Sequence, residues 1–156
     1  MTKVRGFEVV RDDCRKFPNR EIILPRRKTK KAMACDLYSN ETMIIAPGES
    51  YQFMTDVKAY MPDDEGAIMN VRSSIGFAKE LELVNTQGWI DADFYGNPDN
   101  DGNIGIKLRN VGLEPQTIEA GERIAQIMFV TFGIPDGDDE IEKEERVGGT
   151  GSTGTK

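Results

Sequence analysis

Hydrophobic and polar side chains alternate along much of this chain, which is the pattern of strands rather than helices. Residues 51–59 place an apolar, aromatic or threonine side chain at every second position, with Gln52, Asp56 and Lys58 between them. A period of two predicts a strand with one buried face and one solvent-exposed face. The same alternation recurs at 104–109, so we expect a second strand of this kind there.

Two further segments complete the expected strands. Residues 67–71 predict a short strand, and residues 124–132 are apolar at nearly every position apart from Gln126 and Thr131. An uninterrupted apolar run of this length is expected for a strand buried on both faces. Short strands separated by turns are typical of a β-sandwich or jelly roll, so the sequence predicts an all-β fold.

One short helix and a polar tail interrupt this pattern. Ser73 or Ser74 can cap a helix of about two turns over residues 75–83. From Asp136 onward the chain is first acidic and then rich in glycine, serine and threonine, a composition that does not pack as core. We therefore expect a β domain at residues 1–135 and a mobile tail at 136–156.

Composition excludes several classes of function. The formal net charge of −7 argues against non-specific binding of nucleic acid, which needs a basic face. The chain has no apolar run long enough to span a membrane, and its first residues lack the apolar core of a signal peptide. Two cysteines do not suggest a disulfide framework, so we expect a reducing, cytoplasmic location.

The catalytic chemistry available is also restricted, because the chain contains no histidine. Ser-His-Asp and Cys-His mechanisms and histidine-containing zinc sites are therefore excluded. An enzyme of this composition must move protons with Asp or Glu, or use a metal. The stretch GWIDADFYG at 88–96 offers the best acids, because Asp91 and Asp93 stand among large apolar and aromatic side chains.

Four other motifs are weak when each is taken alone. The stretch 97–103, NPDNDGN, begins like a calcium loop, but the twelfth position is Leu108 instead of glutamate, so we predict a hairpin turn. VRSS at 71–74 suits either an anion site or a helix cap beside a surface arginine. A buried Gln126 would need a structural or ligand partner. The glycines at 148–154 lack the Gly-Lys-Ser/Thr of a phosphate loop and predict a flexible terminus.

Taken together and in order, the motifs resemble those of a known family, the trimeric deoxyuridine triphosphatases (dUTPases). The similarity is to the bacterial and phage branch and extends from about residue 24 to residue 154. The five motifs are AMACDL (32–37), RSS (72–74), N-x-x-G-W-I-D-A-D-F (85–94), GERIAQ (121–126) and R-x-G-G-x-G-S-T-G (146–154).

The resemblance implies a jelly-roll homotrimer that hydrolyses dUTP to dUMP and pyrophosphate, with Mg²⁺ on the triphosphate and active sites between subunits. It implies that Asp91 activates the attacking water, that Phe94 stacks under the deoxyribose, and that Asp36 lies near the metal and its waters. The tail would close over the triphosphate from another subunit. The implied substrate-binding residues are Arg72, Ser73, Ser74, Asn85, Gly88, Trp89, Ile90, Phe94, Gln126, Arg146, Gly151, Ser152 and Thr153.

Three positions depart from the family pattern. Ala34 replaces a glycine before Asp36, Phe94 replaces a tyrosine, and Thr150 stands where a phenylalanine normally covers the uracil. Two alternatives stay open at this point. One is a dCTP deaminase-like enzyme, which shares the fold, and the other is a non-catalytic dUTP sensor that regulates a protein partner.

Overall fold

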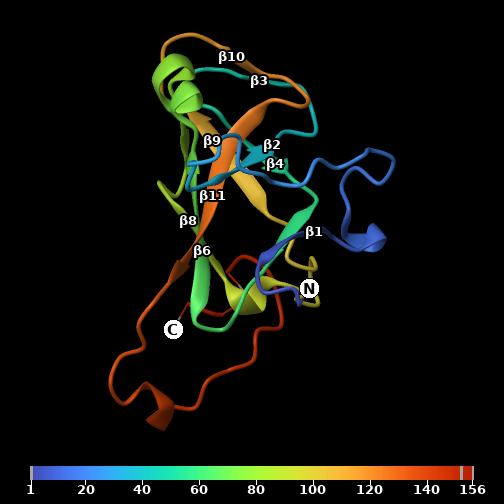
Figure 1. Cartoon of the computed structure of the whole chain (residues 1–156). Helices are drawn as coiled ribbons and strands as arrows, with labels where there is room; N and C mark the ends of the chain where they lie inside the picture. Colours follow the sequence, from blue (N-terminus) through green and yellow to red (C-terminus); the bar gives the residue numbers. More distant parts are fainter. Residues whose placement is uncertain (1, 152, 156) are drawn as a thin grey trace.

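A four-stranded antiparallel sheet forms one layer of the computed structural model, which describes residues 2–151 and 153–155 (Figure 1). The two long central strands pair from Ala125 opposite Val71 to Thr131 opposite Glu65. In spatial order the strands are β2 (Cys35–Tyr38), β11 (Arg123–Thr131), β6 (Glu65–Val71) and β8 (Gly88–Asp91).

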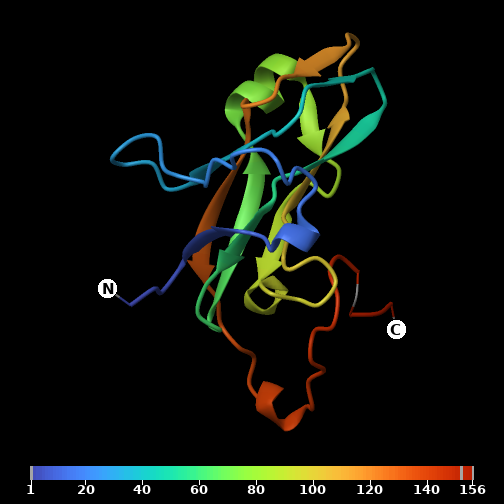
Figure 2. The ribbon, with the colours of Figure 1, turned by 90° about the vertical axis from the view of Figure 1, so that its right-hand side faces the viewer.

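A three-stranded sheet and two smaller strand pairs make up the rest of the fold (Figure 2). The three-stranded sheet has the order β4 (Ser50–Met54), β9 (Gly105–Asn110) and β7 (Leu81–Leu83). The pairs are β1 (Gly6–Val9) with β5 (Val57–Tyr60), and β10 (Gln116–Ile118) with β3 (Met43–Ile45).

One hydrophobic cluster joins the two larger sheets. Phe53, Ile106 and Leu108 from the three-stranded sheet share it with Leu37 and Ile127 from the four-stranded sheet, and all five are almost fully buried. Burying a side chain of this size contributes about 1.5–3 kcal/mol. The predicted all-β class and the alternation at 104–109 are therefore confirmed.

The single strand predicted at residues 51–59 is wrong, because the chain breaks between β4 and β5 at Asp56. This residue has a φ of +56° and is fully buried. Its carboxylate accepts hydrogen bonds from the backbone N–H groups of Lys16 and Phe17 at 2.9 and 2.8 Å. Asp56 and Lys58 therefore lie inside the protein, where Asp56 anchors the N-terminal loop, instead of on a solvent-exposed face.

The predicted helix is also shorter than expected. Its one turn, η2 (Ser74–Ala78), has π geometry, and Ser73 makes no side-chain capping hydrogen bond. Glu80 has a φ of +52°, after which β7 pairs with β9 and buries Leu81 and Leu83. Burial of these leucines outweighs their helix propensity. None of the helices in the described part of the chain has the length or apolar character needed to cross a membrane.

Strand β11 is not buried on both faces along its length. Ile124, Ala125 and Ile127 are buried, residues 128–130 are half-buried, and Gln126 is exposed. The prediction of a fully buried strand is therefore wrong, both at Gln126 and beyond Ile127. The expected buried Gln126 instead projects from the outer face of the four-stranded sheet, where a ligand or another chain can reach it.

The stretch 97–103 is a crossing loop and not the predicted hairpin turn. It follows η3 (Ala92–Phe94), which continues from β8 of the four-stranded sheet. It then leads into β9 of the three-stranded sheet, so it connects the two layers of the fold. Two further short helices, η1 (Asp12–Cys14) and η4 (Asp138–Glu140), lie near the N-terminus and in the tail.

The tail leaves the body after β11, turns at η4 and returns toward the end of β8 (Figures 1 and 2). Gly149 touches the crossing loop, where its backbone N–H lies 3.4 Å from the carboxylate of Asp99. The division at residues 135 and 136 and the mobility of the tail stay predictions.

Candidate functional site

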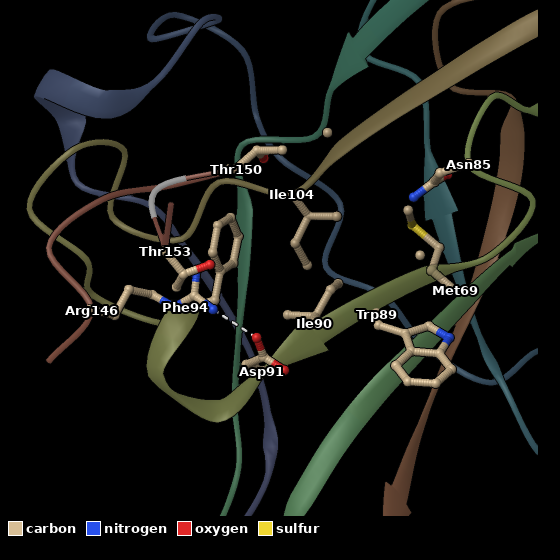
Figure 3. Close-up of a pocket in the computed structure, with 13 residues that line it drawn as sticks. Met69, Asn85, Trp89, Ile90, Asp91, Phe94, Ile104, Arg146, Thr150 and Thr153 are labelled. Carbon is tan, nitrogen blue, oxygen red and sulfur yellow. Dashed lines mark hydrogen bonds and ion pairs between the residues drawn. The ribbon is translucent and has the colours of Figure 1, made fainter. Parts of the chain in front are cut away.

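A cavity opens where β8, η3 and the tail meet (Figure 3). It brings together most of the residues predicted from the third and fifth motifs, and Met69, Ile104, Gly105 and Thr150 complete its wall. The predicted residues that line it are Asn85, Gly88, Trp89, Ile90, Asp91, Phe94, Arg146, Gly151 and Thr153. Ser152 lies outside the described residues.

Strand β8 presents Asp91 at the mouth of this cavity. Asp91 pairs with Gly66 at the end of the strand and then begins η3. Because of this turn, its carboxylate is 68% exposed while Phe94, three residues later, packs against the core. An exposed carboxylate in this position can accept a proton from a water molecule in the cavity.

Arg146 joins the tail to both acids of the third motif. Its Nη2 atom lies 2.6 Å from Asp91 Oδ2, and its Nε atom lies 2.7 Å from Asp93 Oδ1. The guanidinium carbon is also 5.9 Å from the centre of the Phe94 ring. This structure therefore places the tail over the cavity of its own chain and gives a specific partner to Asp93, to which the resemblance assigned no role.

The crossing loop fixes the position of Phe94. The Asn97 side chain is buried and donates a hydrogen bond of 2.8 Å to the backbone carbonyl of Phe94. Gly102 has a φ of +85°, and a Cβ atom there would lie 2.8 Å from the same carbonyl oxygen. A glycine is therefore required at this position, both for its backbone conformation and for the close approach.

A second cluster lies on β2, β6 and β11. The carboxylate of Asp36 is held on one side by Arg72 Nε at 3.1 Å and on the other by Arg123 Nη1 at 2.9 Å. Ser73 and Gln126 line a second cavity beside this carboxylate, and Arg72 also donates to the hydroxyl of Ser74 at 3.4 Å. The first, second and fourth motifs thus form a basic, hydroxyl-bearing surface of the type that binds phosphate.

These two clusters occupy opposite corners of one sheet face. Asp91 is opposite Gly66 on β6, while Gln126 is opposite Asn70, four residues further along the same strand. Strand geometry separates Asp91 from Gln126 by roughly 15 Å and from Asp36 by roughly 20 Å. A general base must reach its proton within hydrogen-bonding distance, so the two clusters of one chain cannot serve the same phosphate.

The acids of the site do not form a metal centre by themselves. Both oxygens of Asp36 are engaged by arginines, so it does not fit as a direct metal ligand. Among residues 2–151 and 153–155, no three His, Cys, Asp or Glu side chains are grouped to hold a metal ion. Mg²⁺ is commonly bound through substrate phosphates and one or two carboxylates, which is the arrangement this surface allows.

Comparison with known proteins decides the family. The dUTPase family model matches residues 20–154. The chain is 45% identical over 152 residues to the deoxyuridine 5′-triphosphate nucleotidohydrolase of Lactococcus lactis, covering 97% of this chain and 99% of that protein. The chain belongs to the dUTPase family. The corresponding enzyme of Corynebacterium diphtheriae is 34% identical over 140 residues, covering 86% of this chain and 87% of that enzyme.

Solved structures agree with this assignment. The dUTPase from Streptococcus mutans superposes with a TM-score of 0.73 at 37% identity, covering 85% of this chain and 99% of that one. A dUTPase of Staphylococcus aureus phage phi11, described with a structural Mg(II) ion, has a TM-score of 0.68. At 19% identity over 92% of this chain and 98% of that one, it supports the fold alone. The predicted dUTPase jelly roll and the resemblance to bacterial and phage members are confirmed.

Two charged residues that line the second cavity were missed from the sequence. Arg123 stands within the quoted fourth motif, three residues before Gln126, and its spacing was the available signal. Lys28, which lines the second cavity, lies in a loop without a motif. The roles assigned to the predicted site residues stay predictions.

Proposed function

We propose that this dUTPase hydrolyses dUTP to dUMP and pyrophosphate at a site centred on Asp91. The observation that carries the proposal is the position of this carboxylate, exposed at the mouth of a cavity walled by Phe94 and the β8 backbone. The ring of Phe94 provides a surface under the sugar, and the backbone of residues 88–90 provides hydrogen-bonding groups for a base edge. Asn85, at the far end of the cavity, binds the uracil.

The reaction follows from the acid and from what surrounds it. Asp91 takes a proton from a water molecule while the oxygen of that water attacks the α-phosphorus. The bond between the α-phosphorus and the oxygen that bridges to the β-phosphate then breaks, which releases pyrophosphate. Arg72, Ser73, Ser74 and Gln126 hold the phosphate chain, and the tail covers it through Arg146 and the backbone of residues 151–153. A positioned general base contributes typically 10²–10⁴-fold to such a step.

The active unit is a homotrimer with sites between subunits. The roughly 15–20 Å between the two clusters of one chain supports this proposal, because only a second copy can bring its Arg72 cluster to the Asp91 of the first. Three identical contacts of this head-to-tail kind close into a ring.

Mg²⁺, if bound together with the triphosphate, would offset part of the phosphate charge. Asp36 would help to hold the metal only through water molecules, because both of its oxygens are engaged by arginines. A cytoplasmic location fits Cys14 and Cys35, which are free thiols. A regulatory protein partner is the remaining alternative role for a dUTP-binding scaffold.

A panel of nucleotides tests the proposal. We expect the purified protein with Mg²⁺ to release pyrophosphate from dUTP much faster than from dCTP, dTTP or UTP. Ammonia released from dCTP would assign the chain to deamination instead. Tight binding of dUTP without any pyrophosphate release would assign it to sensing.

A further inference from the structure

Two exposed segments of opposite charge form almost no ion pairs with the rest of the described residues. Five of the six residues at 26–31, here called the basic loop, are lysine or arginine, and all six are exposed. Residues 136–145, here called the acidic segment, contain seven acids and one lysine, a net formal charge of −6. Among the described residues, the cations of the basic loop form no ion pair, and in the acidic segment only Asp138 does, with Lys143.

The two segments lie apart within one chain. Both ribbon views show the tail looping out beyond the end of the body, away from the loop that precedes β2 (Figures 1 and 2). Each segment nevertheless borders one half of the active site. Lys28 and Thr29 of the basic loop line the cavity of Arg72 and Arg123, while the acidic segment leads directly into Arg146 beside Asp91.

We infer that the basic loop of one copy binds the acidic segment of a second copy. The inference rests on the proposed function, because a complete site requires the Arg72 cavity of one copy to meet the Asp91 cavity of another. That arrangement brings the basic loop of the first copy to the acidic segment of the second. A loop with five positive charges then faces a segment of net charge −6. This complementarity favours the pairing of the basic loop with the acidic segment and disfavours contact between two segments of the same charge.

The contact has a consequence for the tail. The acidic segment immediately precedes the residues that cover the cavity, so anchoring it to a neighbour restricts the positions available to Arg146 and the glycines after it. Substrate affinity should therefore fall as salt increases, because exposed charge pairs are screened within about 10 Å at 0.1 M salt.

A charge-swap series tests the contact. Lys30→Glu with Lys31→Glu reverses the basic loop, and Glu142→Lys with Glu144→Lys reverses part of the acidic segment. Each double variant should weaken binding of a non-hydrolysable dUTP analogue roughly fivefold at low salt, as expected for a few exposed charge pairs. The fourfold variant has the parent net charge and should regain the parent affinity. Lys107→Glu, on the exposed face of β9, is the control and should have no effect.

Equal affinities for the parent, both double variants and Lys107→Glu would overturn the inference. The inference would also be overturned if the loop variant bound the dUTP analogue normally but lost affinity for a DNA oligonucleotide. The basic loop would then be a nucleic-acid-binding segment. Sedimentation and circular dichroism on each variant establish that it is folded and assembled.

Cross-linking of the unaltered protein gives a second, independent readout. Isotope-labelled and unlabelled chains are mixed, allowed to exchange, and treated with a carbodiimide that joins lysines to carboxylates. We expect mass spectrometry to find peptides that join residues 26–31 of one chain to residues 136–145 of the other. Their absence from a trimer that hydrolyses dUTP would overturn this inference and leave the proposed function intact. Their presence in a protein that does not hydrolyse dUTP would support this inference and overturn the proposed function.

Discussion

Arg146 donates a hydrogen bond to Asp91, with 2.6 Å between the guanidinium Nη2 and the carboxylate. The same guanidinium binds Asp93 at 2.7 Å through its Nε atom. An arginine of the tail is thus hydrogen-bonded to the carboxylate that we propose as the general base. In the proposed mechanism, Asp91 accepts a proton once Arg146 turns toward a phosphate, and Asp93 keeps its hydrogen bond to the arginine during this change. We therefore propose different roles for these two acids.

Asp91→Asn and Asp93→Asn form a matched pair that tests this division. Both substitutions remove a charge that faces Arg146. Asp91→Asn should leave binding of a dUTP analogue largely intact and lower kcat by about 10²–10⁴-fold, the usual contribution of a general base. Asp93→Asn should raise KM and leave kcat nearly unchanged. Steady-state kinetics and analogue titration measure both. A loss in kcat of less than tenfold for Asp91→Asn would reject its role.

Gly102→Ala should destabilise the protein and displace Phe94. A residue with a side chain at a φ of +85° costs about 1–2 kcal/mol, and its Cβ would lie 2.8 Å from the Phe94 carbonyl. The matched control is Gly48→Ala, which has a φ of +79° but nothing within 4 Å of the added carbon. Urea unfolding measures the stability of each variant.

Both glycine variants should lose stability, but only Gly102→Ala should also weaken binding of a dUTP analogue. If the two variants bind the analogue equally well, the crossing loop does not position the ring.

The third motif could be interpreted from the sequence because its residues lie close together in the chain, in β8, in the turn before it and in η3 after it. Asp91 and Phe94 are only three residues apart, although the crossing loop still fixes the position of the Phe94 ring. The partners of Asp93 and Asp36 could not be predicted, because Arg146 and Arg123 are 53 and 87 residues away. The strand break at Asp56 was missed for a similar reason. Its cause is a set of hydrogen bonds to residues 16 and 17, about 40 positions earlier in the chain.

The stability of the protein should depend on the hydrogen bond from Tyr95 to Glu8. The two oxygens are 2.6 Å apart, and this bond, followed by the one from Lys3, lowers the pKa of Glu8 below its ordinary value of 4.5. The same bond raises the pKa of Tyr95 to about 12. A carboxyl group whose pKa is lowered on folding stabilises the protein above its unfolded pKa, and that contribution is lost as pH falls through its folded pKa.

Tyr95→Phe should therefore lower Tm at neutral pH, and the difference from the parent should shrink below about pH 4. Thermal melts across this range measure it. In a Glu8→Gln background the tyrosine substitution should lose this pH dependence. A difference that stays constant with pH would contradict the assigned cause.

Thr150→Phe should strengthen the cover over the base. Thr150 lines the cavity, where its methyl and hydroxyl replace the ring that usually stacks on uracil (Figure 3). Stacking of a base on an aromatic ring is worth about 1–3 kcal/mol. The Thr150→Phe variant should therefore bind a non-hydrolysable dUTP analogue at least roughly fivefold more tightly than the parent does. Ligand should also protect the tail from proteolysis more strongly.

Val147→Phe is the control, because Val147 is exposed and does not line the cavity. Equal affinity and equal protection in Thr150→Phe and the parent would mean that the tail does not close over the base at this position.

The central claim is that one active site combines Asp91 of one copy with the Arg72 cluster of another. Mixing two inactive variants, Asp91→Asn and Arg72→Ala, tests it most directly, with dUTP-dependent pyrophosphate release as the readout. In a ring of three with random exchange, about a quarter of the sites receive both intact residues. We therefore expect about a quarter of the parent activity to return. No recovery after mass spectrometry has verified subunit exchange would show that each chain contains its whole site, and would contradict the account.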